Sequence, residues 1–276
     1  MLSETSETTV PGRGRPRRPR ARPVAREVVA ATVGVMRARD LLVRARQLPR
    51  APQLAVAEEV EVRRARRLMP VRPRARVVTV VPTFGRSALA ADAVESALGQ
   101  TVTDHAVVVV VDGGPLPGLP HDPRVHTVRL AVHRGVPGLV RNVGIRVSSS
   151  PFLAFLDDDN TWEPHHLEAS LAAHDAGAEL TYTGLGQVLP DGGEGEVIAV
   201  PFARRTLRND SYIDTSTMVV RRSRAVRFSR APRGGSAVYE DWHLAYRLSR
   251  RLRTELVPEV TVRYLLHPDG YMQRHL

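Results

Sequence analysis

Three short, mostly apolar runs constrain the fold of this chain most strongly: Val77–Val81 and Ala106–Val111, which are rich in β-branched residues, and Phe152–Leu156. Runs of this length without alternating polar residues are typical of strands buried on both faces, as in a parallel sheet. Helix-forming segments lie between them, at Ser87–Gln100 and at about Gly138–Val147. Strands that alternate with helices at these intervals predict β-α-β units and a parallel sheet.

The second half of the chain has a different pattern. After about Ala178 the apolar segments are shorter and are separated by turn residues such as Pro190–Gly193. We expect further strands at Val125–Leu130, Glu179–Thr183, Glu196–Phe202, Thr217–Arg221 and Glu259–Leu265, and a helix at about Tyr239–Leu252. The predicted fold is therefore α/β, with a mixed, mainly parallel sheet flanked by helices.

Charge divides the chain into parts. Residues 1–76 contain 19 Arg against 7 acidic residues, a net charge of +12, whereas residues 77–276 contain 21 Arg against 22 acidic residues. Residues 1–25 are rich in Pro, Gly and Arg, and we expect a disordered tail there. Residues 26–76 should form a helical extension and residues 77–276 the main domain. Because the main domain is about neutral, we expect no nucleic-acid partner.

The helical extension has two interpretations. We predict helices at Arg26–Leu48 and Leu54–Met69; the second has its Glu early and its Arg late, as a helix dipole favours. The pair either packs on the main domain as a solvated layer, or offers its arginines to anionic lipid or an acidic partner. The first 20 residues have no apolar core of a secretory signal, and no stretch approaches the roughly 20 apolar residues of a membrane span. We expect a cytoplasmic protein, membrane-peripheral if the lipid interpretation holds.

Polar residues follow three of the predicted strands: Pro82–Arg86, Asp112–Gly114 and Asp157–Asn160. Open parallel sheets bind ligands beyond the carboxyl ends of their strands, so these segments should meet at one site. Three adjacent aspartates repel one another unless a cation neutralises them, and Mn²⁺ or Mg²⁺ takes such oxygen ligands. Alternation along an extended segment would turn Asp157 and Asp159 to one side and Asp158 to the other. The alternative is an acidic turn that caps a helix at Pro164.

Asp112 and Arg141 are candidate ligand contacts. The carboxylate of Asp112 can accept from a nucleobase imide N–H or a ribose hydroxyl, and Gly113 would let a ring approach the backbone. An ordinary turn is the alternative for this Asp-Gly-Gly sequence. Arg141, in a predicted helix, could reach a diphosphate or the base-binding carboxylates; otherwise it is a surface residue.

Glu240, Asp241 and Trp242 open the last predicted helix after a Gly-rich loop. A carboxylate near an acceptor hydroxyl can act as general base, which makes Asp241 the candidate base; helix capping is the alternative role. His267 follows the last predicted strand and is a candidate metal ligand or a donor to one.

The segments VVPTFGR, VVDGG, GLVRNVGI, FLAFLDDDNTWEPHHLE and YEDWHLAYRL, in this order, resemble the successive motifs of family 2 inverting glycosyltransferases with the GT-A fold. The resemblance covers about 190 of the 276 residues. It implies that Pro82, Thr83, Asp112 and Gly113 hold the nucleoside and that Arg86, Arg141, Asp158, Glu240 and Trp242 line the donor site. It further implies that Asp157 and Asp159, with His267, bind the metal, and that Asp241 deprotonates the acceptor.

The expected partners are thus a nucleotide-diphosphate sugar, with UDP or dTDP favoured, and an acceptor that the sequence does not identify. Two alternatives remain at this stage. A nucleotidyltransferase shares the sheet and the aspartate-bound metal, although Pro82–Arg86 is poor in the Gly that such enzymes place after their first strand. A non-catalytic nucleotide-binding adaptor with an Arg-rich tail would not need Asp241.

Overall fold

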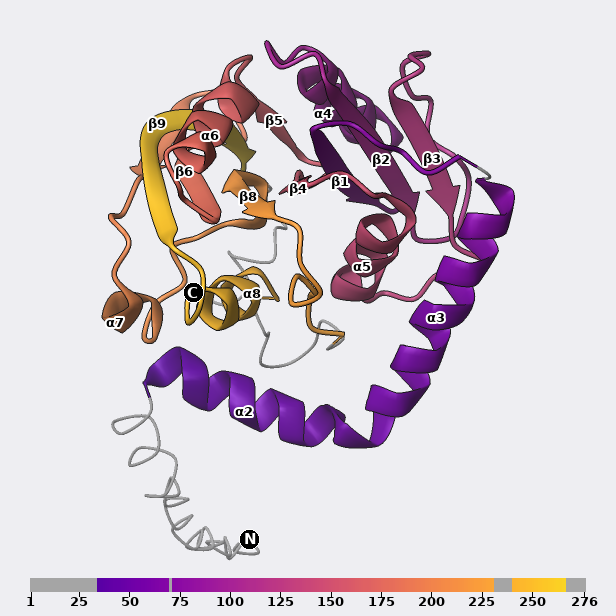
Figure 1. Ribbon diagram of the computed structural model, residues 1–276, viewed down its shortest axis with the longest axis horizontal. Helices are drawn as coiled ribbons and strands as arrows, with labels where there is room; N and C mark the ends of the chain where they lie inside the picture. Colours follow the sequence, from indigo (N-terminus) through magenta and orange to yellow (C-terminus); the bar gives the residue numbers. More distant parts are fainter. Residues whose placement is uncertain (1–33, 70, 231–239, 267–276) are drawn as a thin grey trace, which may run out of the picture.

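The computed structural model describes residues 34–69, 71–230 and 240–266. The predicted N-terminal tail, the first part of the predicted helix Arg26–Leu48 and His267 therefore lie outside the described residues. A nine-stranded sheet forms the centre of the molecule (Figure 1), with the strand order β3-β2-β1-β4-β8-β6-β9-β5 and with β7 paired to β6.

The first half of the sheet is parallel, as predicted. Strand β1 (Val77–Thr83) lies between β2 (His105–Val111) and β4 (Phe152–Phe155), and β3 (Val125–Arg129) extends the sheet beyond β2. Helices α4 (Ser87–Leu98) and α5 (Pro137–Val147) make the crossovers.

Both faces of these strands are buried. Val78 and Val80 belong to the hydrophobic cluster that contains α5, whereas Val77 and Val81 belong to the cluster that contains α4 and α6 (His166–Asp175). This two-sided burial is the physical reason for the uninterrupted apolar runs in the sequence.

The second half of the sheet is mixed and differs from the prediction in its bounds. It contains β5 (Asn160–Trp162), β6 (Leu180–Val188), β7 (Glu194–Ile198), β8 (Met218–Arg221) and β9 (Thr254–Leu265), with α7 (Arg204–Leu207) and the 3-10 turn η2 (Thr215–Thr217) between them. β9 starts five residues before the predicted Glu259. In its pairing with β6, Thr183 lies opposite Val257 and the next residue, Gly184, lies opposite Val260. Pro258 therefore lies in a β-bulge, where a proline does not interrupt the strand.

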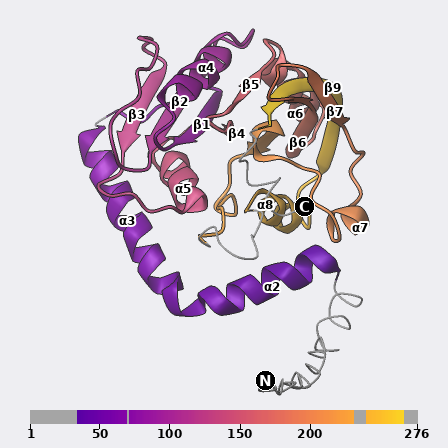
Figure 2. The same cartoon turned by 180° about the vertical axis from the view of Figure 1, so that it is seen from behind.

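Two helices, α2 (Val35–Gln47) and α3 (Ala51–Leu68), joined by the 3-10 turn η1 (Leu48–Arg50), form an L-shaped arm around one side of the molecule in both views (Figures 1 and 2). α3 packs against α5 and contributes Val62 and Ala65 to the same core cluster. The sequence suggested that the acidic residues of α3 stabilise the helix dipole, but the first turn of α3 contains no acidic residue. Glu58 and Glu61 are buried and hold arginines of the main domain.

Helix α8 (Glu240–Leu248) is shorter than predicted and starts at the first residue described after position 239. Along residues 34–69, 71–230 and 240–266, the structure contains no helix with the length and apolarity needed to cross a membrane.

Candidate functional site

The predicted site residues of the parallel half meet at one edge of the sheet. Thr83 ends β1, Asp112 follows β2, and Asp157–Asp159 follow β4, which neighbours β1. The Thr83 hydroxyl bonds the carboxylate of Asp158, so these neighbouring strand ends are in direct contact.

The three aspartates do not alternate as an extended segment would. β4 ends at Phe155, and Asp158 and Asp159 form a turn. Arg86, at the start of α4, pairs with both Asp158 (3.3 Å) and Asp159, whereas Asp157 pairs with Arg141. The three carboxylates thus divide between two arginines instead of alternating along an extended strand, because the chain turns immediately after β4.

Ser216, in η2, holds this turn in place. Its hydroxyl oxygen accepts hydrogen bonds from the Asp157 N–H (3.2 Å) and from Asn160 Nδ2 (2.9 Å), and its carbonyl accepts one from Trp162 Nε1 (2.8 Å). Asp214 in turn accepts from the Ser216 N–H at 2.7 Å. Ser216 and Asp214 are not among the residues predicted from the sequence, where the Asp-Thr-Ser-Thr order, typical of a capped turn, is the available signal.

Arg141 is not a surface residue. Its side chain is 2% exposed and bridges Asp157 and Glu240, with Nη1 2.9 Å from Glu240 Oε1. Burial alone would lower the pKa of Arg141, but the charges of Asp157 and Glu240 outweigh it and the pKa is raised. Arg141 thus joins the aspartate turn after β4 to the start of α8.

Asp241 and Asp214 lie in the same buried, acidic environment. Burial raises the pKa of Asp241 well above its usual range, and the charges of Asp214 and Glu240 raise it further. Burial and the charge of Asp157 raise the pKa of Asp214 to about 7. Tyr264 of β9, also missed by the sequence analysis, faces these acids, and its pKa is raised by burial and by their charges. Asp157, Glu240, Asp214 and Asp241 thus all lie near the guanidinium of Arg141.

Trp242 was predicted to line the donor site, but it is buried away from these acids. It is 1% exposed, its Nε1 donates to the Leu207 carbonyl, and its ring stacks on Tyr246 with centroids 5.1 Å apart. Helical periodicity turns Trp242 into the core when Asp241 faces the acids. Its role here is to anchor α8.

The carboxylate of Asp112 is hydrogen-bonded to backbone groups of a nearby loop. Its two carboxylate oxygens accept hydrogen bonds from the backbone N–H groups of Arg134 (2.8 Å) and Gly135 (2.9 Å). Gly113, with φ of 77°, has its Cα so close to His133 that a Cβ would lie 2.5 Å from the His133 nitrogen. The room that this glycine leaves is thus used by the loop before α5, not by a ligand ring as predicted.

Two aromatic side chains missed by the sequence analysis flank Asp112. Phe84, just after β1, stacks on His133 with ring centroids 3.7 Å apart, and about half of each side chain is exposed. An exposed planar pair beside a carboxylate can support a flat heterocycle. Pro82 is half-buried and lies within β1, next to its last residue.

The acidic donor set fits a hard divalent cation. Carboxylate oxygens are the ligands that Mn²⁺ and Mg²⁺ prefer. Burial and the charges of Asp159 and Asp157 raise the pKa of Asp158, so a cation beside these carboxylates would favour their ionised forms. No three acidic or histidine side chains of the described ranges converge on one point as a complete metal cage. Mg²⁺ needs no such cage, because it is commonly held by one or two carboxylates plus water and substrate phosphate.

Among proteins of known sequence, two curated relatives are similar over part of their length. Succinoglycan biosynthesis protein ExoW of Rhizobium meliloti is 32% identical over an alignment of 102 residues, and the match covers 34% of this chain and 32% of ExoW. ExoO of the same organism is 36% identical over 123 residues, 42% of this chain and 35% of ExoO. The chain thus spans about a third of the length of these relatives.

Among solved structures, TarS of S. aureus (TM-score 0.57, 17% identity) covers 72% of this chain, which matches 38% of TarS. TarS 1-349 in complex with UDP-GlcNAc matches with a TM-score of 0.57 and 16% identity, over 73% of this chain and 61% of that one. The mannosyltransferase PcManGT from Pyrobaculum calidifontis, solved in complex with GDP-Man and Mn²⁺, matches with a TM-score of 0.52 and 18% identity. The match covers 84% of this chain and 71% of the PcManGT chain. At these identities the likeness shows the fold, which is GT-A.

The sequence model described as "Glycosyl transferase family 2" matches residues 78–229, which run from β1 past the aspartate turn to the segment against α5. This match covers more than half of the 276 residues. The protein therefore belongs to glycosyl transferase family 2.

Proposed function

We propose that this chain is a metal-dependent, inverting glycosyltransferase that moves a sugar from a nucleotide-diphosphate donor to a hydroxyl or other nucleophile of an acceptor. The observation that carries the proposal is Arg141, which links the aspartate turn to Glu240 beside Asp241. Metal, diphosphate and base functions would then lie around one buried cation. The family match favours sugar transfer over nucleotidyl transfer.

The nucleoside would lie at the ends of β1 and β2. The Phe84–His133 pair offers a surface on which a base can stack, and the nucleoside would lie beside the strand-end residues Pro82, Thr83, Asp112 and Gly113. Asp112 would accept from the imide N–H of a pyrimidine, which favours UDP or dTDP. TarS has been solved with UDP, in keeping with this preference, whereas PcManGT has been solved with GDP-Man.

The reaction would be a single displacement at the anomeric carbon. Asp241 takes the proton of the acceptor nucleophile, which attacks the face opposite the diphosphate, so that configuration inverts. Arg141 and Arg86 hold the departing diphosphate oxygens. Asp157 and Asp159 would hold Mn²⁺ or Mg²⁺, which, when bound, neutralises charge on the diphosphate.

The nucleotide site is tested by titrating UDP and dTDP into the protein by calorimetry, with and without Mn²⁺. We expect binding that depends on Mn²⁺ and that Asp159→Ala weakens by at least tenfold, because a carboxylate ligand of the cation is lost. Asp92→Ala, on the exposed side of α4, is the charge-matched control and should bind like the wild type. If no nucleoside diphosphate, GDP included, binds the wild type, the proposed function is wrong.

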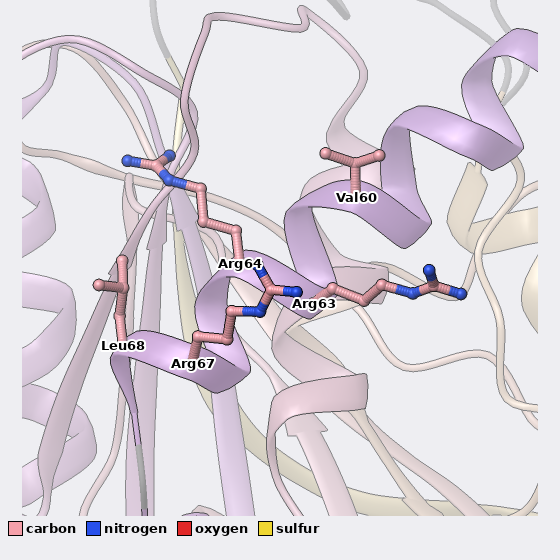
Figure 3. Close-up of a pocket in the computed structure, with 5 residues that line it drawn as sticks. All are labelled: Val60, Arg63, Arg64, Arg67 and Leu68. Carbon is pink, nitrogen blue, oxygen red and sulfur yellow. The ribbon is translucent and has the colours of Figure 1, made fainter.

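A second proposal concerns the outer face of α3, which we infer to be a docking surface for an anionic bilayer. Val60 and Leu68 are 54% and 70% exposed and, with Arg63, Arg64 and Arg67, line a surface pocket of about 430 Å³ (Figure 3). Exposed aliphatic groups flanked by arginines suit the boundary between headgroups and acyl chains, where arginine stems lie along apolar surface. The net charge of +12 in residues 1–76 adds to this attraction.

Co-sedimentation with vesicles tests this surface. We expect binding to vesicles that contain phosphatidylglycerol, and none to pure phosphatidylcholine. Arg63→Gln/Arg67→Gln should weaken binding about 30-fold, since each arginine near an anionic surface contributes about 1 kcal/mol. Arg205→Gln/Arg251→Gln removes the same charge from exposed positions elsewhere and is the control. Equal binding by the two double variants would contradict the assignment to α3.

A further inference from the structure

Glu61 is a buried acid in the arm that precedes the family 2 region. Its side chain is 2% exposed and lies on the face of α3 that also buries Val62 and Ala65. A carboxylate in such a place is costly unless each oxygen has a partner. The partners of Glu61 are therefore informative about why the acid is there.

Both oxygens of Glu61 hold the loop between β3 and α5. Oε2 accepts a hydrogen bond from the Ala131 N–H at 3.1 Å, and Oε1 accepts one from Arg134 Nη2 at 2.9 Å. Arg64, one turn along α3, lies 3.8 Å from Oε2 and balances the remaining charge. One side chain of the arm thus fastens both ends of the segment 131–134.

The same loop encloses Asp112 on its other side. The N–H groups of Arg134 and Gly135 donate to the two oxygens of Asp112, and the His133 ring lies on Phe84. Arg134 is the common member: its side chain binds Glu61 while its backbone binds Asp112. A continuous path of contacts therefore runs from α3 to the proposed nucleoside subsite.

We propose that Glu61 is a positioning residue for donor binding: through Arg134 it holds the loop 131–135 in the conformation that presents Asp112 and His133 to the nucleoside. This proposal rests on the proposed function. It assigns to α3 a part in donor affinity without any contact to the donor, because a loop that is already ordered loses less entropy when the nucleotide binds.

Glu61→Gln tests the proposal, with Glu59→Gln as the matched control on the same helix. Glutamine keeps the shape of the side chain but loses the negative charge that faces Arg134. Glu59 is 39% exposed and pairs with Arg63 and Arg146. For Glu61→Gln we expect UDP to bind about tenfold more weakly and KM for the donor to rise, with kcat within about twofold, since a charge-assisted hydrogen bond is lost outside the reacting centre.

Hydrogen exchange supplies a readout that does not depend on any nucleotide. In Glu61→Gln the amides of Arg134 and Gly135 should exchange about tenfold faster, whereas those of β1 should not change. Arg134→Gln removes the same contact from the other side, so the double variant should be no weaker in UDP binding than either single variant.

The outcomes separate the two proposals. Wild type that binds no nucleoside diphosphate would overturn the proposed function and the role of Glu61 with it. Wild type that binds UDP, with Glu61→Gln and Arg134→Gln unchanged in affinity and in loop exchange, would overturn the positioning role alone. Weaker binding with unchanged loop exchange would also overturn it, because the loop would not be the intermediary.

Discussion

Replacement of Asp241 by Asn is expected to lower kcat by about 10²–10⁴-fold, the usual contribution of a general base, while UDP binding stays within about twofold of wild type. Asparagine has the shape of aspartate, and its carbonyl oxygen can still accept the hydrogen bond that Asp241 receives from the Trp242 N–H at 2.6 Å. The variant therefore removes the base and keeps the start of α8.

The thermal stability of this variant is part of the prediction. Since burial and the charges of Asp214 and Glu240 raise the pKa of Asp241, the folded protein favours its neutral form. A neutral Asn should therefore leave Tm the same or raise it. Because the pKa of Asp241 is raised, wild-type activity should increase with pH as this group loses its proton. Asp210→Asn, at an exposed site, is the control. Full activity in Asp241→Asn would exclude this residue as the base.

Replacement of Glu58 by Ala is expected to destabilise the protein by about 3 kcal/mol, which lowers Tm by roughly 10 °C. Glu58 is 0% exposed, and its oxygens bind Arg230 (2.6 Å), Asn142 (2.9 Å) and Arg146 (3.2 Å). Alanine would leave a cavity and three donors without their shared acceptor. Arg230 and Arg146 can turn to solvent in part, so the loss should lie at the lower end of the range for a broken buried ion pair.

Chemical denaturation measures the loss in the free energy of unfolding, and two further variants serve as comparisons. Glu58→Gln keeps the volume and one acceptor oxygen, so its loss should be about half as large. Glu59→Ala, on the exposed neighbour, should change stability far less, because an exposed ion pair exchanges its partner for water. If Glu58→Ala and Glu59→Ala were equally stable, α3 would not be fastened to α5 through Glu58.

The position of the site could be predicted from the sequence, but its internal pairing could not. Val77–Val81 and Phe152–Leu156 predict buried strands of one parallel sheet, because runs of this kind are typical of two-sided burial. The polar residues that follow them are then expected at the same edge of the sheet. Nothing in the local sequence indicates that Arg141 pairs with Asp157 and Glu240. These partners are 16 and 99 residues away, and their distances depend on how α5 and α8 pack.

The N-terminal arm shows the same division. Composition alone predicted two charged helices before residue 77, and the charge count separated them from a neutral main domain. Whether Glu58 and Glu61 face water or the core depends on the rotation of α3 against α5, since a helix with charges on several sides can bury more than one of its faces. The sequence by itself thus determined the parallel sheet, the edge where its polar strand ends meet and the family, because these follow from local patterns. Only the tertiary structure decided which acid meets which arginine, because ion pairs between distant segments are set by packing.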